Sequence, residues 1–220
     1  EVWGCDVIGM TNMPEAKLAR EADPNVRMYT NPAPGVTVEE LEMTRDYVDI
    51  WCPSTGFVFQ SELAEKFALM KNSGSTLWFY QCAGEAKHMS PLAYYRGQAW
   101  LAWQYGATGI GYWTYCTGWD DPWFSAPAKN EHMLIYHGAG VVASKRWEAI
   151  RDGIEDYSMF VALREAAQAA AAAGKAPVAV REAEELLGER IVTIARCVDA
   201  DEPGTSPSLT GHEGIRPIAD

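Results

Sequence analysis

Short apolar segments alternate with longer amphipathic ones along the chain. Four of the apolar segments are rich in β-branched or aromatic residues and are bounded by Pro, Gly, Asn or Ser, as buried strands are. They are NVRMYTNP (25–32), YVDIWCPS (47–54), STLWFYQC (75–82) and TGIGYWTY (108–115). We therefore expect parallel strands near 26–31, 48–52, 76–81 and 109–114, adjacent in chain order, with helices on one side of the sheet.

Start and stop signals of helices lie between these segments. One helix precedes the first strand, and the others follow the first three strands in turn. The signals are Pro14 at a helix start, a capping box of Thr37 and Glu40, Ser61 and Gly74 at the two ends of one helix, and Ser90 before Pro91.

The pattern changes after the fourth strand. A long loop (116–143) leads to a helix from about Ser144 to Gly174, whose Ala-rich end has high helix propensity. A second helix follows Pro177, and a polar tail rich in Pro, Gly and Ser ends the chain. We expect a main domain over 1–175, a C-terminal helix over 176–199 and a polar tail over 200–220.

The alternation of strand and helix is typical of an α/β fold with a parallel sheet. Eight such units close a TIM (β/α)8 barrel, which takes about 250 residues. Four units predict the C-terminal half of such a barrel followed by C-terminal helices, or a compact α/β variant. In the half-barrel interpretation, the strand at 26–31 is an edge with exposed apolar surface.

Composition and net charge argue against some classes of binding partner. The chain has 220 residues and a net charge of −12, which argues against nucleic acid or an anionic membrane as partner. No apolar run approaches the roughly 18 residues of a membrane span, and no signal peptide is visible. The 5 cysteines form no C-x-x-C or Cys/His cluster, so we expect buried thiols and neither a metal site nor a cofactor.

Aromatic and polar residues gather where the strands end. The stretch GYWTYCTGWDDPW (111–123) combines aromatic rings with two adjacent carboxylates. Ligands of parallel α/β folds bind beyond the carboxyl ends of the strands, and sugars suit rings edged by amides, phenols and acids. The candidate sugar-binding residues are Asn31, Tyr80, Gln81, Trp113, Tyr115, Trp119, Asp121 and Trp123. Trp78 and Tyr112 are expected to point away from the site as core residues.

Four stretches resemble one known family. SKRWEAIRDGIEDYSMF (144–160) is similar to the Ser-x-Arg…Glu-x-x-Arg-Asp-Gly-x-Glu-Asp-Tyr segment of the catalytic domain of glycoside hydrolase family 123. The Asp-Pro-Trp at 121–123, the helix YYRGQAWLAWQYG with its following Gly-x-x-Gly turn, and AREADPN also resemble that family. The resemblance extends over roughly residues 14 to 170.

The resemblance implies a (β/α)8 barrel that hydrolyses β-linked N-acetylgalactosaminides. It implies a substrate-assisted retaining mechanism, in which the 2-acetamido oxygen of the substrate attacks the anomeric carbon. The family's adjacent Asp-Glu pair would close a strand upstream of residue 1, so residues 1–220 are expected to hold the sugar-binding wall and to lack the N-terminal barrel half and the catalytic pair. The family favours a secreted or periplasmic location.

Two alternatives stay open. The chain is a non-catalytic carbohydrate-binding degenerate barrel, or it is a small open α/β domain whose aromatics form the core. For the segment at 144–160, a structural ion network that anchors the 116–143 loop is favoured over catalysis. Arg151 and Glu155 are spaced as an i, i+4 pair, and Arg146 reaches either the acids at 152–156 or a loop carbonyl.

Overall fold

The computed structural model describes residues 2–5, 13–81, 90–116 and 133–192. The described residues form two compact units. The first contains residues 2–5, 13–81 and 106–113, and the second contains residues 90–105, 114–116 and 133–192.

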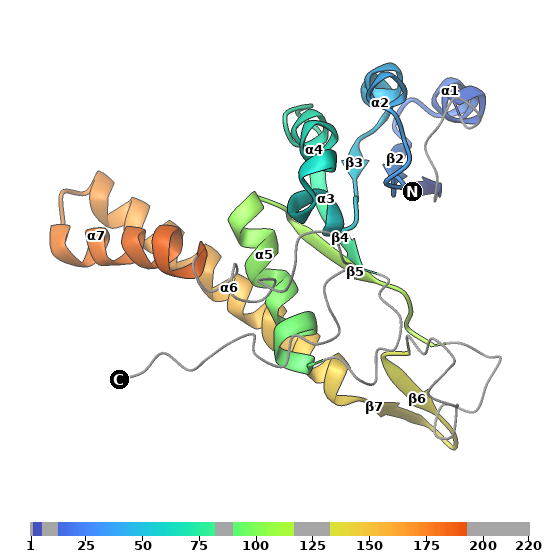
Figure 1. Ribbon diagram of the computed structural model, residues 1–220. Helices are drawn as coiled ribbons and strands as arrows, with labels where there is room; N and C mark the ends of the chain where they lie inside the picture. Colours follow the sequence, from blue (N-terminus) through green and yellow to red (C-terminus); the bar gives the residue numbers. More distant parts are fainter. Residues whose placement is uncertain (1, 6–12, 82–89, 117–132, 193–220) are drawn as a thin grey trace. The chain divides into compact units, whose positions relative to one another are not determined.

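The first unit is built on a parallel sheet of five strands in chain order, β1 to β5 (Figure 1). The strands are β1 (Val2–Cys5), β2 (Arg27–Thr30), β3 (Ile50–Trp51), β4 (Thr76–Gln81) and β5 (Gly109–Tyr112). Strands β2 to β5 lie within the four predicted segments and pair in parallel with their chain neighbours. The predicted α/β class with a parallel βα repeat is therefore confirmed.

Strand β1 was not predicted. It pairs in parallel with β2 along its whole length, from Val2 opposite Arg27 to Cys5 opposite Thr30. The expectation that 26–31 forms an edge strand is wrong for this reason.

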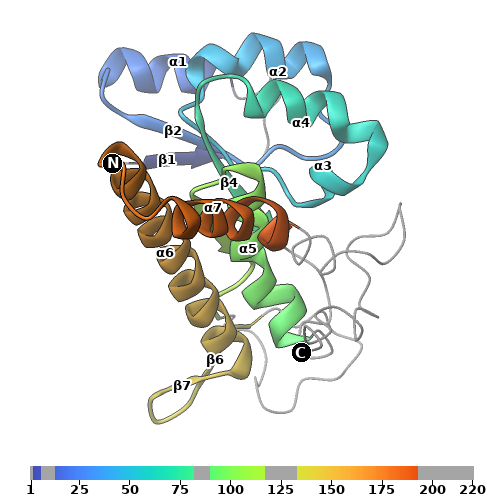
Figure 2. The same ribbon diagram turned by 90° about the vertical axis from the view of Figure 1, so that its left-hand side faces the viewer.

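Helices cover one side of this sheet (Figure 2). They are α1 (Met13–Ala22), α2 (Val38–Thr44), α3 (Gly56–Phe59) and α4 (Ala64–Lys71), with 3-10 turns η2 (Arg45–Tyr47) and η3 (Ser61–Leu63). Burial alternates along β4, where Leu77 and Phe79 are buried and their neighbours are half-exposed. Phe79 stacks on Phe67 of α4 with ring centroids 6.1 Å apart, so the buried face is the one that the helices cover.

Local signals set the ends of these helices. Thr37 and Glu40 form the predicted capping box at the start of α2. Gly74, the predicted stop after α4, has a φ of +86°, a backbone conformation that favours glycine. Arg20 of α1 donates to the Asp49 carboxylate before β3, and Asp49 also accepts from the Met28 amide at 2.7 Å.

The second unit is mainly helical. Its elements are the π-helical turn η5 (Pro91–Arg96), α5 (Gly97–Tyr105), β6 (Ile135–His137), β7 (Val141–Ala143), α6 (Lys145–Ala172), α7 (Pro177–Glu185) and the π-helical turn η6 (Leu186–Arg190). Ser90 caps η5 as the sequence predicts, Ser144 stands at the predicted start of the long helix and caps α6, and Pro177 begins α7. The antiparallel hairpin of β6 and β7 lies within the predicted loop, where Gly138 and Gly140 were the available turn signal.

Aromatic rings fill the space between α5 and α6. Trp100 and Trp103 of α5 each meet Phe160 of α6 with ring centroids 5.1 and 5.5 Å apart, and Trp103 also meets Tyr157. Excess tryptophan in this part of the chain therefore serves packing. None of the described helices has the length and apolar character that crossing a membrane requires.

Gly109 of β5 provides the first test of the fold. A Cβ at this position would lie 2.6 Å from the Trp78 ring, whereas a Cβ at Gly111 would meet nothing closer than 3.7 Å. We expect Gly109→Ala to lower the free energy of unfolding by about 1–3 kcal/mol because the ring must move. Gly111→Ala, the matched control in the same strand, should change it by less than about 0.5 kcal/mol. Urea unfolding of the full-length protein measures both, and equal effects would contradict the packing described.

Candidate functional site

One face of the first unit's sheet carries no covering helix from α1 to α4 and presents aromatic and amide groups. Tyr29 of β2 and Trp78 of β4 lie on this open face with ring centroids 6.0 Å apart, and both are half-buried. Tyr80 follows Trp78 by two residues and shares its face. Asn31 continues the alternation of β2 and is also half-buried. Asn31 follows the carboxyl end of β2 and Tyr80 lies near that of β4, whereas Trp78 lies in the middle of β4.

Two glycines leave space beside the aromatic rings. Gly109 and Gly111 pair with Trp78 and Tyr80 in the sheet, and a Cβ on either glycine would point at the corresponding ring. Trp113 continues this alternation on β5 and is 53% exposed. Its amide donates to the Gln81 carbonyl at 2.9 Å, so the backbone that carries the indole is held by the sheet. The open face thus combines indole and phenol rings, two of which pack against the glycines of β5.

The structure separates Gln81 from the other candidates. Gln81 alternates to the helix-covered side, is 5% exposed and donates its amide to the Thr55 hydroxyl in the segment after β3. Tyr112 pairs opposite Gln81 and shares its face, as the sequence predicted for Tyr112. The expectation that Trp78 points away is wrong, because residues two apart in a strand share a face and Trp78 therefore accompanies Tyr80.

Cys52 lies at the end of β3 on the open face but is itself buried. Burial raises the pKa of its thiol to about 11, and a hydrogen bond with Tyr29 opposes part of that rise. The sequence missed Tyr29 as a site residue, although it stands two residues before Asn31 and the same periodicity identifies it.

Tyr115 belongs to the second unit. Its carbonyl accepts hydrogen bonds from the amides of Leu134 and Ile135, both at 3.2 Å. Its ring meets Trp147 of α6 with centroids 5.6 Å apart and planes at 74°. These hydrogen bonds therefore hold the two residues that flank the segment, Tyr115 and Leu134, next to each other.

Arg146 of α6 forms hydrogen bonds with the residues at the C-terminal end of the same segment. Its guanidinium donates to the Met133 carbonyl and to the Tyr136 hydroxyl, and its side chain is buried. Of the two alternatives predicted for Arg146, the structure shows the loop carbonyl. Burial raises the pKa of neighbouring Tyr95 to about 12, while the positive charge of Arg146 opposes that rise.

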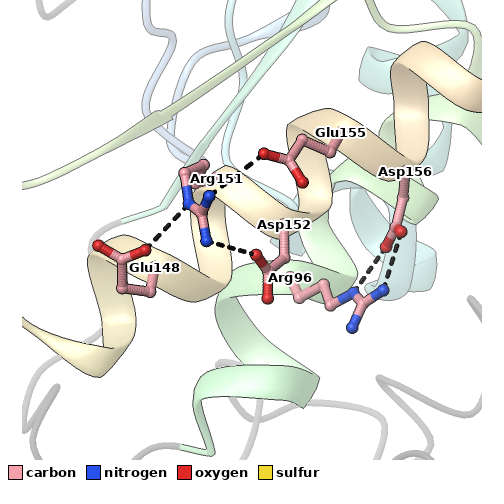
Figure 3. A network of polar contacts seen from close by, with 6 residues as sticks. All are labelled: Arg96, Glu148, Arg151, Asp152, Glu155 and Asp156. Atoms are coloured by element: carbon pink, nitrogen blue, oxygen red, sulfur yellow. Dashed lines mark hydrogen bonds and ion pairs between the residues drawn. The ribbon is translucent and has the colours of Figure 1, made fainter.

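The Arg-Asp-Gly-Ile-Glu-Asp-Tyr string (151–157) lies on α6 and acts in helix packing (Figure 3). Asp156 is buried and accepts two hydrogen bonds from Arg96, at 2.6 and 2.8 Å, and one from the Trp100 indole at 2.8 Å. Hydrogen bonding to Asp156 is the main cause that raises the pKa of Arg96. A Cβ on Gly153 would lie 2.8 Å from the Arg96 carbonyl oxygen, so glycine permits the close approach of the two elements.

The remaining charges of the string are exposed. Arg151 forms the predicted pair with Glu155 at 3.4 Å and also reaches Glu148 and Asp152 (Figure 3). This network was expected to anchor the 116–143 loop. Instead, Asp156 holds η5 through Arg96, and Arg146 together with Ser144 holds the described end of the loop.

Three sequence candidates, Trp119, Asp121 and Trp123, lie outside the described residues. Within residues 2–5, 13–81, 90–116 and 133–192, no group of three or more His, Cys, Asp or Glu is arranged to hold a metal ion. What the described residues offer is an aromatic surface with phenol and amide groups, which suits a ligand with apolar C–H patches and hydroxyls.

Comparison with known proteins identifies a family over most of the chain. The model of the family described as glycoside hydrolase 123, catalytic domain, matches residues 3–163. That range includes the parallel sheet apart from Val2, the hairpin and the first part of α6. No solved structure matches the chain significantly.

Short stretches of the chain are also similar to two curated proteins, both named S-methyl-5'-thioadenosine phosphorylase. The protein of Cereibacter sphaeroides is 48% identical over 56 residues, which is 26% of this chain and 15% of that protein. The protein of Rhodospirillum rubrum is 90% identical over 21 residues, 10% of this chain and 7% of that protein. The chain thus spans a small part of the curated relatives that it matches, and matches of this extent carry no activity from one protein to another.

The Asp156 cluster generates one prediction. Asp156→Asn removes the negative charge of the carboxylate to which Arg96 and Trp100 both donate hydrogen bonds. We expect this substitution to lower the free energy of unfolding by about 1.5–3 kcal/mol. Glu155→Gln changes the neighbouring, exposed acid and should cost less than about 1 kcal/mol. Both are measured by chemical unfolding, and an equal cost for the two variants would refute the packing role of Asp156.

The buried thiol of Cys52 leads to a second prediction for this site. Because its folded-state pKa is about 11 instead of 9.0, the native thiol stays protonated at pH 8–9 and should resist iodoacetamide, while exposed Cys116 reacts. The unfolded chain loses this proton first, so the contribution of Cys52 to stability falls as the pH rises from 9.0 to about 11. Mass spectrometry of alkylated peptides measures the reaction, and similar rates for the two thiols would contradict the burial of Cys52.

Proposed function

The chain belongs to the family of glycoside hydrolase 123 catalytic domains, and from this premise we propose that the complete protein hydrolyses β-linked N-acetylhexosaminides, N-acetylgalactosaminides in particular. The observation that carries the proposal is the open aromatic face of the sheet, with Trp78, Tyr80 and Trp113 beside the glycines of β5. A pyranose can stack its C–H face on such rings while its hydroxyls and acetamido group bond to the polar groups at the rim.

We propose that the sheet is part of a (β/α)8 barrel. Parallel strands in chain order, with helices on one side, are the repeat from which such barrels are built. The remaining strands would come from chain outside residues 1–220. The catalytic domain would extend to about residue 175, with 176–199 as an added helix and 200–220 as a polar tail.

The proposed mechanism is substrate-assisted and retaining. The acetamido oxygen of the substrate forms a bond to the anomeric carbon as the glycosidic bond breaks, and the Glu of the Asp-Glu pair gives its proton to the leaving oxygen. The neighbouring Asp orients and stabilises the acetamido group. Water then opens the cyclic intermediate and returns a proton to the Glu. We propose that this pair lies in chain upstream of residue 1, as the resemblance leads us to expect.

The residues of this chain would bind and orient the sugar. Tyr80 is our candidate donor to the acetamido carbonyl, and Trp113 or Trp123 would form the apolar floor. Asp121 would accept hydroxyl hydrogen bonds, with Asn31, Tyr115 and Trp119 along the wall. Gln81 would hold the segment after β3 through Thr55 rather than touch the sugar. Holding the acetamido group still contributes to catalysis because the attacking atom must be close and aligned.

Tyr80 provides the test. In the full-length parent, we expect Tyr80→Phe to lower kcat/KM for an aryl N-acetyl-β-galactosaminide by about 10- to 100-fold, because one positioned donor is lost. Tyr112→Phe is the matched control, since Tyr112 lies on the adjacent strand and on the opposite face, and it should leave kcat/KM within about twofold. Asp121→Ala is a second arm with the same expectation as Tyr80→Phe.

Near-normal kcat/KM for both Tyr80→Phe and Asp121→Ala, with unchanged folding, would mean that the aromatic residues are scaffold. A full-length protein that binds the sugar without hydrolysing it would instead support the non-catalytic carbohydrate-binding alternative.

A further inference from the structure

The tryptophans whose side chains the structure describes, between residues 16 and 192, divide into two groups by the partner of the indole N–H. In the first group the N–H donates within the protein, from Trp51 to the Ser73 hydroxyl, from Trp100 to Asp156 and from Trp103 to the Leu187 carbonyl. In the second group, Trp78, Trp113 and Trp147, it donates to no other described residue. An indole that serves packing normally satisfies its N–H inside the protein, so the second group marks rings that face a ligand or solvent.

Trp147 differs from Trp78 and Trp113 because it belongs to the second unit. It lies in the first turn of α6, a helix whose start is next to strand β7 of the hairpin (Figure 1). Its side chain is 38% exposed and that of Tyr115 is 50% exposed. The two rings stand at 74° to each other, so they form a corner with one apolar wall on each side.

Hydrogen bonds hold this corner in place. The Ser144 hydroxyl accepts from the Trp147 amide at 3.2 Å and donates to the Leu134 carbonyl. The Leu134 amide in turn donates to the Tyr115 carbonyl at 3.2 Å. Backbone atoms next to both rings are thus connected through one buried serine. Rings held in this way lose little conformational freedom when a ligand binds.

We propose that Trp147 and Tyr115 form an aromatic corner that binds a sugar ring, with Trp147 as a carbohydrate-contacting residue of this protein. One ring stacks against the C–H face of the pyranose, and the indole N–H donates to a hydroxyl at its edge. The inference rests on the proposed function, because it takes the ligand to be the glycan on which that function acts.

Exposure alone does not distinguish Trp147, and Ile154 shows why. Ile154 lies on the same helix and is 52% exposed, yet it offers neither a planar face nor a donor. A sugar requires both, and in the second unit the corner supplies them together. A protein partner would use the apolar surface of the helix as a whole, including Ile154.

A labelled full-length protein tests the proposal directly. With 5-fluorotryptophan incorporated, the fluorine resonance of Trp147 is identified as the one missing from Trp147→Phe. We expect methyl N-acetyl-β-galactosaminide to shift this resonance in a saturable way. The Trp103 resonance should not move, because that indole donates internally.

Substitution provides the second measurement. We expect Trp147→Ala to raise KM for the glycan substrate about five- to tenfold while kcat stays within about twofold, because a stacked ring contributes to binding and not to bond breaking. Trp147→Phe should recover part of the loss. Ile154→Ala is the matched control on the same helix and should leave KM unchanged.

The outcomes separate this inference from the proposed function. A sugar that shifts other tryptophan resonances, is hydrolysed, and leaves Trp147 unmoved would overturn the corner and leave the proposed function standing. A saturable shift of Trp147 without any hydrolysis would support the corner and overturn the proposed hydrolytic function. An equal effect of Trp147→Ala and Ile154→Ala on KM would show that the substitutions act through a general perturbation of α6, and would also overturn the corner.

Discussion

The second unit depends on one buried carboxylate. Asp156 binds Arg96 through two hydrogen bonds and the Trp100 indole through a third, so a single side chain of α6 fixes both η5 and α5. A buried acid would otherwise cost several kcal/mol in desolvation, which the guanidinium offsets. Gly153, one turn earlier, lets the backbones approach. With α5 fixed in this way, Trp103, Tyr157 and Phe160 can pack as a close aromatic cluster.

Helix α6 therefore performs two separate tasks along its length. Its middle, from Gly153 to Phe160, binds the preceding helix. Its first turn, with Ser144 and Arg146, binds the carbonyls of Leu134 and Met133 and so fixes the residues that follow the 116–132 segment. The two tasks use different chemistry, since the middle combines a charge pair with aromatic packing and the first turn combines a cap with a buried guanidinium. A specific sequence string can thus be structural although it belongs to an enzyme family.

Prediction from the sequence succeeded where the signal is local. The strand at 76–81 and the caps at Thr37 and Ser90 depend on residues within a few positions of each other. Prediction failed where contacts between residues far apart in the sequence determine the structure. Nothing near Asp156 in the sequence indicates that Arg96 is its partner 60 residues away. The faces of Gln81 and Trp78 were misjudged because the pattern alone does not say which side of a sheet the helices cover.

The hydrogen bond between the Leu134 amide and the Tyr115 carbonyl has a consequence for the evolution of the segment that it closes. The two ends of the intervening segment are hydrogen-bonded to each other and to the start of α6. The free energy of closing this loop therefore rises only slowly when residues are inserted, by about 0.6 kcal/mol for each doubling of the loop length. The length of the segment between Tyr115 and Leu134 can therefore change at a small cost in closure free energy, while the hydrogen bonds of Ser144 and Arg146 to the residues at its described end need not change.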